Sequence, residues 1–366
     1  MQNLFGGIYK DKTVLVTGHT GFKGSWLVFW LHQMGAKVVG YSLEAPTTPN
    51  HLELLDLNIT SVVGDIRNLE KLNDTFRKYE PDIVFHLAAQ PLVRLSYENP
   101  IETYETNVIG TLKVLEACRN HNVKAVVNIT SDKAYENREW IWGYRENDPM
   151  GGYDPYSSSK GCADLLASSY RNSYFNLNDY KKTHSTLLAT CRAGNVIGGG
   201  DWAKDRLITD IMLSVSQDKK VSIRNPYATR PWEHVLEPLS GYLHIGQKLL
   251  EEKPEFADAW NFGPSDEGSI TVEEVVQNVK KHWNKIAYEI NRDPNQLHEA
   301  NLLKLDCSKA HILLKWKDVW DSDTTFEKTV KWYKAYYEDD KSILTQLDLE
   351  SYIADAQVKN IEWAVK

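Results

Sequence analysis

Short runs of apolar and β-branched residues recur along the first half of the chain, and stretches with helical periodicity follow most of them. The runs at 12–17, 37–41, 60–63, 82–87, 124–129 and 185–193 are predicted strands, and 25–34, 68–78, 101–120 and 156–174 are predicted helices. The run at 124–129 is largely apolar, as expected for a strand buried on both faces. This alternation predicts an α/β fold with a doubly wound parallel sheet of the Rossmann type.

The alternation weakens after residue 193, which predicts a second unit. Helices are predicted at 205–216, 237–252, 272–282 and 326–337, with a short strand and turn at 260–264. We expect residues 1–193 to form a nucleotide-binding domain, to which parts of 235–265 return. Residues 194–366 are expected to form mainly a smaller, discontinuous C-terminal lobe that binds the substrate.

Composition limits the classes of function. Hydrophobic residues make up 42% and charged residues 25%, as in globular proteins. The net charge of -8 argues against a nucleic-acid partner. The apolar run at 26–31 is too short to cross a bilayer, and no signal-peptide core precedes it, so no membrane association is expected. The four cysteines are scattered, which argues against disulfides and a metal site and favours a reducing cytoplasm.

A glycine-rich turn joins the first predicted strand to the first predicted helix. Gly18 permits the tight turn, Gly21 lets the backbone approach a pyrophosphate, and Gly24 lets the helix pack closely on the strand. The start of the helix then faces the anion. The second strand ends at Ser42, with neither an acidic residue nor a following Arg, so this locus leaves the choice between NAD and NADP open.

Polar or small residues follow the other predicted strands, at the edge where such sheets bind ligands. Asp65 follows the third strand, where it either accepts a hydrogen bond from an adenine amino group or caps the next helix. Ala88 and Ala89 follow the fourth strand and allow a cofactor to lie flat against the backbone. The polar run 131–133 follows the fifth strand and is a candidate for chemistry.

Tyr156 and Lys160 are expected to lie one turn apart on the same helix face. A Lys ammonium beside a phenol favours the phenolate and lowers its pKa. The pair is therefore a candidate acid/base unit for a sugar hydroxyl. The alternative is a Tyr that packs on a Lys stem at a helix start.

Taken together, these motifs resemble those of the extended short-chain dehydrogenase/reductase family. Within that family they are similar to the sugar-nucleotide 4,6-dehydratases, in particular those acting on CDP-glucose. The resemblance rests on the segments 18–27, 130–133, 140–146, 152–156 and 230–235, and it extends from about residue 10 to 340. It implies a cytoplasmic enzyme that makes deoxy-sugar precursors for cell-surface polysaccharide.

The resemblance implies a tightly bound NAD that is reduced and reoxidised within one turnover. Tyr156, helped by Ser131 and Lys160, would take the proton from the 4-hydroxyl of CDP-glucose while the C4 hydride goes to NAD. A base then removes the C5 proton, an acid assists the loss of the 6-hydroxyl as water, and the hydride returns to C6. Asp132 matches that acid, which must be protonated, as burial favours.

Lys133 stands where related dehydratases carry a Glu as the C5 base. It is expected either to act as the base, after desolvation or beside a second cation, or to stay charged and stabilise the enolate. A third interpretation is that Lys133 only pairs with Asp132.

The resemblance also implies two sets of binding residues. The cofactor set comes from the glycine-rich turn, the strand ends and two helices: Gly18, Thr20, Gly21, Phe22, Lys23, Asp65, Ile66, Leu87, Ala88, Ala89, Thr106, Tyr156 and Lys160. The substrate set is Gln90, Arg94, Asn195, Arg206, Arg230 and Asn261. An ion pair between Arg230 and Glu233 at the surface is the alternative for Arg230.

A homodimer or homotetramer is implied as well. Leu165, Leu166, Ser169 and Tyr170, on the helix that begins at Tyr156, either pair with a second subunit or are buried in the core. Two other functions are weighed against the dehydratase. One is a sugar-nucleotide epimerase or reductase, which needs no acid such as Asp132 for water loss. The other is a cofactor-binding scaffold with an inactive site, which needs no Tyr156/Lys160 pair.

Overall fold

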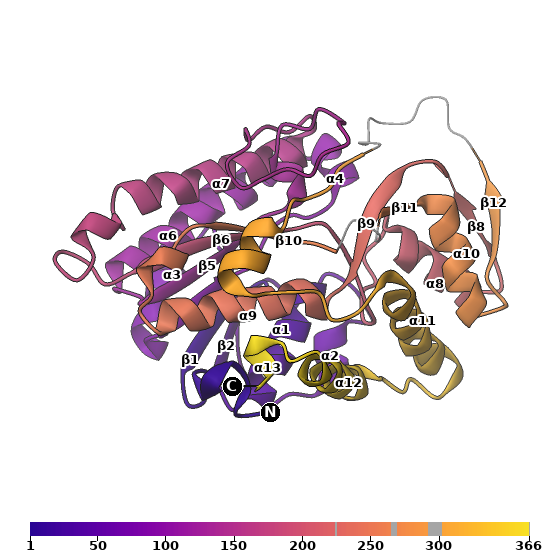
Figure 1. The fold of residues 1–366 in the computed structure, drawn as a ribbon, viewed down its shortest axis with the longest axis horizontal. Helices are drawn as coiled ribbons and strands as arrows, with labels where there is room; N and C mark the ends of the chain where they lie inside the picture. Colours follow the sequence, from indigo (N-terminus) through magenta and orange to yellow (C-terminus); the bar gives the residue numbers. More distant parts are fainter. Residues whose placement is uncertain (224, 265–268, 292–301, 366) are drawn as a thin grey trace.

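A seven-stranded parallel sheet forms the base of the molecule, in the order β10-β6-β5-β4-β1-β2-β3 (Figure 1). The computed structural model describes residues 1–223, 225–264, 269–291 and 302–365. The strands are β1 Thr13–Thr17, β2 Lys37–Ser42, β3 Thr60–Val63, β4 Ile83–His86, β5 Ala125–Ile129, β6 Leu187–Ala193 and β10 Ala259–Phe262. The predicted doubly wound parallel sheet is confirmed. The strand order reverses between β1 and β4, which is where such sheets bind ligands.

Helices cover both faces of this sheet and create two cores. On one face lie α3 (Leu69–Tyr79), α6 (Thr111–Asn120) and α7 (Pro155–Asn172), and on the other lie α1 (Phe22–Gln33) and α9 (Leu236–Leu250) (Figure 1). Side chains alternate along β1, so Leu15 joins the first core whereas Val14 and Val16 join the second. The shorter helices around this base are α2 His51–Leu55, α4 Val93–Glu98, α5 Pro100–Tyr104, η1 Leu4–Gly7, η4 Leu177–Asp179, η5 Pro254–Phe256 and η7 Ala310–Leu314.

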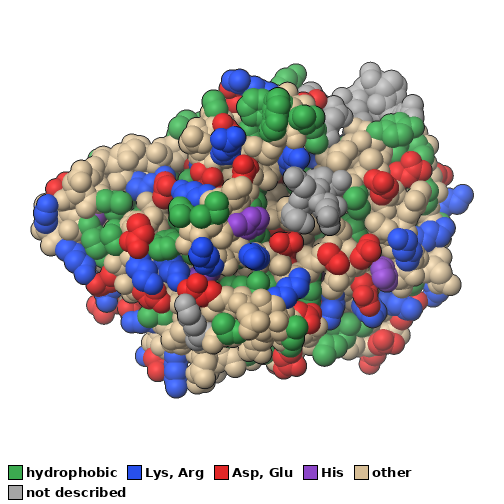
Figure 2. Space-filling view, in the orientation of Figure 1, with side chains coloured by type: hydrophobic (Ala, Val, Ile, Leu, Met, Phe, Trp, Pro, Cys, Tyr) green, Lys and Arg blue, Asp and Glu red, His purple; other side chains and the backbone are tan. Residues whose placement is uncertain are grey.

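The smaller lobe lies beside the carboxyl ends of the strands (Figure 1). It contains a three-stranded sheet of β11 (Ser269–Thr271), β9 (Thr229–His234) and β7 (Asn195–Ile197), and a pair of β12 (Ala287–Ile290) with β8 (Lys220–Ile223). Its helices are α8 Leu207–Ser216, α10 Val272–His282 and α11 Ser322–Glu338. The face shown in Figure 2 carries interspersed acidic and basic side chains. Within the described ranges, no helix is long and apolar enough to span a membrane.

The C-terminal helices pack on the base of the molecule instead of extending the small lobe. They are α12 (Thr345–Val358) and α13 (Glu362–Val365), and α13 contacts η1, so the two ends of the chain are neighbours (Figure 1). The rings of Phe5 and Trp363 stack with centroids 5.1 Å apart. The assignment of 194–366 mainly to a substrate lobe, with parts of 235–265 returning to the nucleotide-binding domain, remains a prediction.

The predicted helix over 101–120 is interrupted. The structure forms α5, then a π-helical segment η2 (Glu105–Gly110), then α6. Asn107, within η2, accepts a hydrogen bond from the Gln90 backbone N–H (2.8 Å) and donates to the Gln90 carbonyl (3.0 Å) and to Ser159 Oγ (2.8 Å). These contacts tie the loop after β4 to α7, and wide turns of this kind are frequent at functional sites.

A buried ion pair joins α7 to the sheet. The side chains of Asp164 on α7 and Arg192 on β6 are 2% and 4% exposed, with Arg192 Nη2 2.6 Å from Asp164 Oδ1. Thr130, at the end of β5, donates to Asp164 Oδ2 over 2.8 Å. Arg192 Nη1 also donates to the Tyr135 hydroxyl over 2.5 Å. One carboxylate therefore fixes the helix, the end of β5 and β6 relative to one another.

Asp164→Asn should lower the free energy of unfolding by about 3–5 kcal/mol, because it leaves the buried Arg192 guanidinium without its counter-charge. Chemical denaturation measures the loss. Asp74→Asn is the matched control, since the Asp74–Arg77 pair has a similar distance of 2.8 Å but is exposed. We expect the control to stay within about 0.5 kcal/mol of the wild type. Equal losses in the two variants would contradict the role given to Asp164.

Candidate active site

A cavity of about 1070 Å³ opens at the carboxyl ends of β1, β4, β5 and β6, between the large sheet and the smaller lobe. Its volume suits a dinucleotide together with a second ligand. All of the sequence-predicted site residues lie in described parts of the chain, and all except Asp132 and Asn261 line the cavity. No group of His, Cys, Asp or Glu within the described residues is arranged to hold a metal ion.

The glycine-rich turn forms the floor of the cavity at the start of α1. Gly18 has a φ of +75°, and a Cβ there would lie 2.7 Å from the Ala88 backbone nitrogen. A Cβ on Gly24 would lie 2.1 Å from the Gly18 carbonyl oxygen. These positions therefore accept only glycine, and they bring β1, α1 and the end of β4 close together. The backbone N–H groups at the start of α1 then face the cavity, which fits a pyrophosphate.

Asp65 does not cap the helix that follows it. The N-cap of α3 is Asn68, whose side chain accepts from the Lys71 N–H over 3.0 Å. The Asp65 carboxylate instead forms an ion pair with Arg67 (2.7 Å), and hydrogen bonds from Arg67 hold the pKa of Asp65 below its usual value. Asp65 lines the cavity together with Ile66 and Thr106. Of the two interpretations of Asp65, the hydrogen bond from an adenine amino group is therefore the one that remains.

Tyr156 and Lys160 project from the first turns of α7. Asp154 caps this helix by accepting from the Ser157 N–H (2.9 Å), and Pro155 occupies the first turn. Both side chains line the cavity although they are largely buried. Burial, together with the nearby Lys23 ammonium, lowers the pKa of Lys160 to about 8.

The prediction that Lys160 lowers the pKa of Tyr156 is wrong for the structure as described. Burial raises the pKa of Tyr156 to about 12, and a hydrogen bond with Ser131 opposes this only in part. The reason is geometric, because the Lys160 ammonium is directed toward the Ile129 carbonyl, 3.5 Å away. The cost of burying a phenolate therefore exceeds the attraction of the nearby cation.

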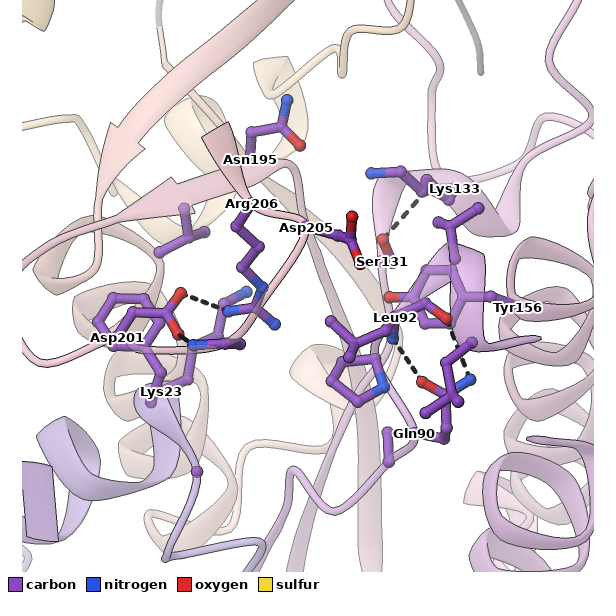
Figure 3. Close-up of a pocket in the computed structure, with 18 of the residues that line it drawn as sticks. Lys23, Gln90, Leu92, Ser131, Lys133, Tyr156, Asn195, Asp201, Asp205 and Arg206 are labelled. Atoms are coloured by element: carbon purple, nitrogen blue, oxygen red, sulfur yellow. Dashed lines mark hydrogen bonds and ion pairs between the residues drawn. The ribbon is translucent and has the colours of Figure 1, made fainter. Parts of the chain in front are cut away.

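Ser131, Asp132 and Lys133 meet at a single turn after β5, η3 (Asp132–Ala134). The Ser131 hydroxyl donates to Asp132 Oδ1 (2.9 Å) and accepts from the Lys133 N–H (3.3 Å). Lys133 Nζ lies 3.8 Å from Asp132 Oδ1, so the predicted ion pair is present. Figure 3 shows Tyr156, Ser131 and Lys133 on one wall of the cavity. Asp132 is 1% exposed and lies behind this wall, in contact with it through Ser131 and Lys133.

The opposite wall carries Lys23, Arg206 and Asn195 (Figure 3). Arg206 Nη1 donates to Asp201 Oδ2 over 2.6 Å. Sequence reasoning missed Asp201, although it directly follows the run of glycines 198–200 that marks a close approach of backbone. Its carboxylate fixes the Arg206 guanidinium at the cavity, so Asp201 belongs to the site.

The remaining predicted substrate residues differ in their placement. Arg94 lies 3.6 Å from Asp205, and Arg230 Nη1 donates to the Thr229 carbonyl over 3.0 Å. The predicted surface pair of Arg230 with Glu233 does not form among the described contacts, because Glu233 is buried. The Gln90 side-chain amide is bonded to Thr103 Oγ1 on α5 and to the backbone of Leu92 in its own loop.

Asn261 lies outside the cavity. It is fully buried on β10, accepts from the Tyr135 hydroxyl (2.8 Å) and donates to the Tyr144 carbonyl (2.8 Å). These bonds hold the loop at 135–144 against the edge of the large sheet. The prediction that Asn261 binds substrate is therefore not supported by its position.

The family whose model matches residues 15–331 is described as GDP-mannose 4,6 dehydratase. The chain belongs to this family. It is 55% identical over 350 residues to the CDP-glucose 4,6-dehydratase of Salmonella typhimurium, covering 94% of this chain and 97% of that protein. The predicted membership of the sugar-nucleotide 4,6-dehydratases is thereby confirmed.

Two solved structures share the fold of this chain at lower sequence identity. The UDP-glucose 4-epimerase of Thermus thermophilus in complex with NAD is 23% identical with a TM-score of 0.74, covering 88% of this chain and 99% of that one. The dTDP-glucose 4,6-dehydratase of Bacillus anthracis in complex with NAD is 23% identical with a TM-score of 0.72, covering 89% and 98%. Epimerases and dehydratases therefore share this architecture, and the side chains of the site must discriminate between them.

Gly18→Ala should weaken NAD binding by at least ~10-fold, because a Cβ at this position pushes the turn away from the end of β4. Isothermal titration calorimetry, in which NAD is added to the cofactor-free protein, measures the affinity. Gly35→Ala is the control, since Gly35 also has a positive φ (+81°) but meets only side-chain atoms, at 3.5 Å or more. Unchanged affinity in Gly18→Ala, or equal weakening in both variants, would count against the assigned pyrophosphate site.

Proposed function

We propose that this protein catalyses the NAD-dependent dehydration of CDP-glucose to CDP-4-keto-6-deoxyglucose. One observation carries the proposal: the cavity joins a Tyr156/Lys160 pair, suited to oxidation, with the Ser131-Asp132-Lys133 turn, suited to water loss. The similarity to the Salmonella CDP-glucose 4,6-dehydratase, over nearly the whole length of both chains, supports the choice of substrate.

The residues of the cavity floor fit NAD. The close approach of β1, α1 and β4 at Gly18, Gly24 and Ala88 leaves room for a pyrophosphate against backbone. NAD, when bound, supplies the acceptor for the C4 hydride and returns that hydride to C6. The residues proposed to hold it are Gly18, Thr20, Gly21, Phe22, Lys23, Asp65, Ile66, Leu87, Ala88, Ala89, Thr106, Tyr156 and Lys160, all of which line the cavity.

Tyr156 takes the proton of the 4-hydroxyl. Ser131 orients the Tyr156 phenol through the hydrogen bond between the two side chains. The raised pKa of Tyr156 means that its phenolate needs a nearby positive charge. Lys160 provides that charge when its ammonium turns from the Ile129 carbonyl toward the phenol.

Asp132 supplies the proton for the departing 6-hydroxyl. Its place in the turn, beside Ser131 and Lys133 of the cavity wall, supports this role. Lys133 lines the cavity beside it and either removes the C5 proton or stabilises the enolate that forms. Arg94, Arg206, Arg230 and Asn195 also line the cavity. The three guanidinium groups suit a nucleoside diphosphate, because such groups bind phosphate oxygens through paired donors.

With CDP-glucose as substrate, the purified protein should form a product lighter by one water, and kcat/KM should exceed that for dTDP-glucose and GDP-mannose. Tyr156→Phe should lower kcat by about 10²–10⁴, because the first proton transfer is lost. Mass spectrometry of the nucleotide sugars follows both results. A C4 epimer formed without loss of water would instead favour the epimerase function.

We infer that the enzyme is a homo-oligomer that pairs through α7 and the helices before it. Leu165 is 58% exposed on α7, and Ile101 on α5 and Ile109 on η2 are also exposed. Tyr170 is buried and donates to Glu116 over 2.5 Å, so it does not belong to this surface. A cytoplasmic location completes the proposal, and the four free cysteines agree with a reducing compartment.

Leu165→Glu should shift the protein toward the monomer, because it places a charge in an apolar interface. Size-exclusion chromatography with light scattering measures the mass. Leu347→Glu is the matched control, because Leu347 is equally exposed (57%) but lies on α12, on the other side of the molecule (Figure 1). The same mass for Leu165→Glu and the wild type would exclude this surface as the interface.

A further inference from the structure

Glu233 is a buried carboxyl group that the mechanism above does not use. Along β9, Arg230 and Trp232 line the cavity, and Glu233 has the opposite orientation, as alternation along a strand requires. Its side chain is 2% exposed, and neither carboxyl oxygen has a hydrogen-bond partner among the described residues. Buried polar groups without partners are rare and are commonly bridged by ordered water or kept for function.

The surroundings of Glu233 connect it to Asp132. A Cβ on Gly194 would lie 3.4 Å from Asp132 Oδ2 and 3.4 Å from Cγ of Pro231, a residue of β9. Asp132 Oδ2 and β9 therefore lie on either side of Gly194. The Tyr242 hydroxyl, on α9, is fully buried and likewise has no hydrogen-bond partner within the part of the chain that the structure describes. Tyr242 is close enough to Glu233, Asp132 and Tyr156 for their charges to affect its pKa.

The charged groups around Glu233 allow it to hold a proton and to release it. They come from four parts of the chain: Lys23 on α1, Asp132 on η3, Glu237 on α9, and Asp318 before α11. Burial raises the pKa of Glu233 well above the usual carboxyl range, which favours the protonated form. The Lys23 ammonium provides a counter-charge once that proton is lost.

Glu237, in the first turn of α9, shows how a buried carboxyl group with a structural role is bonded in this fold. It accepts from the Val319 N–H (3.0 Å), the Trp320 N–H (2.7 Å) and the Tyr352 hydroxyl (2.8 Å). Glu233 makes no such bonds, although burying a carboxyl without them disfavours folding. Its chemistry, and not its contribution to stability, is therefore the feature to explain.

The proposed reaction sets a proton balance. Oxidation transfers the 4-hydroxyl proton to Tyr156, and the C5 proton that the base removes is replaced when hydride returns to C6. When the C6–O bond breaks, the leaving hydroxide takes a proton from Asp132 and departs as water. Asp132 must therefore regain one proton in every turnover, although it is 1% exposed and lies behind the cavity wall.

We propose that Glu233 is the group that reprotonates Asp132, directly or through water ordered by the Tyr242 hydroxyl. Glu233 is thus a positioning residue that acts through Asp132, and this inference rests on the acid role proposed for Asp132. Glu233 becomes a carboxylate beside Lys23 when it gives up its proton, and it regains one from solvent. The proton that Tyr156 releases to solvent balances that uptake.

Glu233→Gln tests the proposal, because the amide keeps size and polarity but donates no proton to a carboxylate. In rapid-quench experiments with CDP-glucose, the first turnover should match the wild type, because the proposed relay acts only after Asp132 has given up its proton. After a burst of about one dehydrated product per active site, turnover should slow by at least ~10-fold. Glu233→Asp, which keeps the acid, should restore multiple turnovers in part, and Tyr242→Phe should slow only the later turnovers.

Two further variants separate the possible failures. Asp132→Asn should give no burst and should accumulate oxidised CDP-4-ketoglucose that has not lost water. If this variant accumulates no CDP-4-ketoglucose, the role of Asp132 itself is overturned. Glu237→Gln is the matched buried-carboxyl control, expected to lower the melting temperature without producing a burst. The proposal for Glu233 is overturned if Glu233→Gln turns over linearly at the wild-type rate, or if its first and later turnovers slow equally.

Discussion

The ion pair between Asp164 and Arg192 is the contact on which the geometry of the site depends. It is buried, so it is weakly screened, and the same carboxylate accepts from Thr130, the residue before Ser131. The helix that carries Tyr156 and Lys160 is thereby held in register with the turn that carries Ser131, Asp132 and Lys133. Acid/base groups from two elements meet because a third pair of side chains, away from the cavity, aligns those elements.

Burial sets the chemistry of the groups so aligned. It raises the pKa of Tyr156 to about 12 and lowers that of Lys160 to about 8. The charge of Lys23 opposes the rise in the pKa of the buried Glu233, and the charge of Glu233 opposes the fall in the pKa of the buried Lys23. The cavity wall is rich in cations, which suits a diphosphate ligand. A bound nucleotide sugar would both balance these charges and exclude water, so the site is organised for proton transfers inside a filled cavity.

Local sequence signals predicted the parts of the fold that local physics determines. The strands and the glycine-rich turn follow from side-chain alternation and from the absence of a Cβ at Gly18 and Gly24. What depends on distant partners was not predictable in this way. Asn107 interrupts a helix because it bonds to the loop after β4, Asn261 turns away from the cavity to hold another loop, and Asp132 is recessed behind Ser131. Predicting the pKa of Tyr156 requires knowing where the Lys160 ammonium is directed, and the spacing of the two residues in the sequence does not show this.

The central claim is that one site removes a hydride from C4 of the sugar and returns the same hydride to C6 after water is lost. CDP-glucose labelled with deuterium at C4 tests it most directly, with unlabelled NAD in excess and the product analysed by NMR. The account predicts deuterium at C6 of CDP-4-keto-6-deoxyglucose and hydrogen from solvent at C5. Deuterium lost to the free cofactor pool, or retained at C4 of an epimerised sugar, would contradict it.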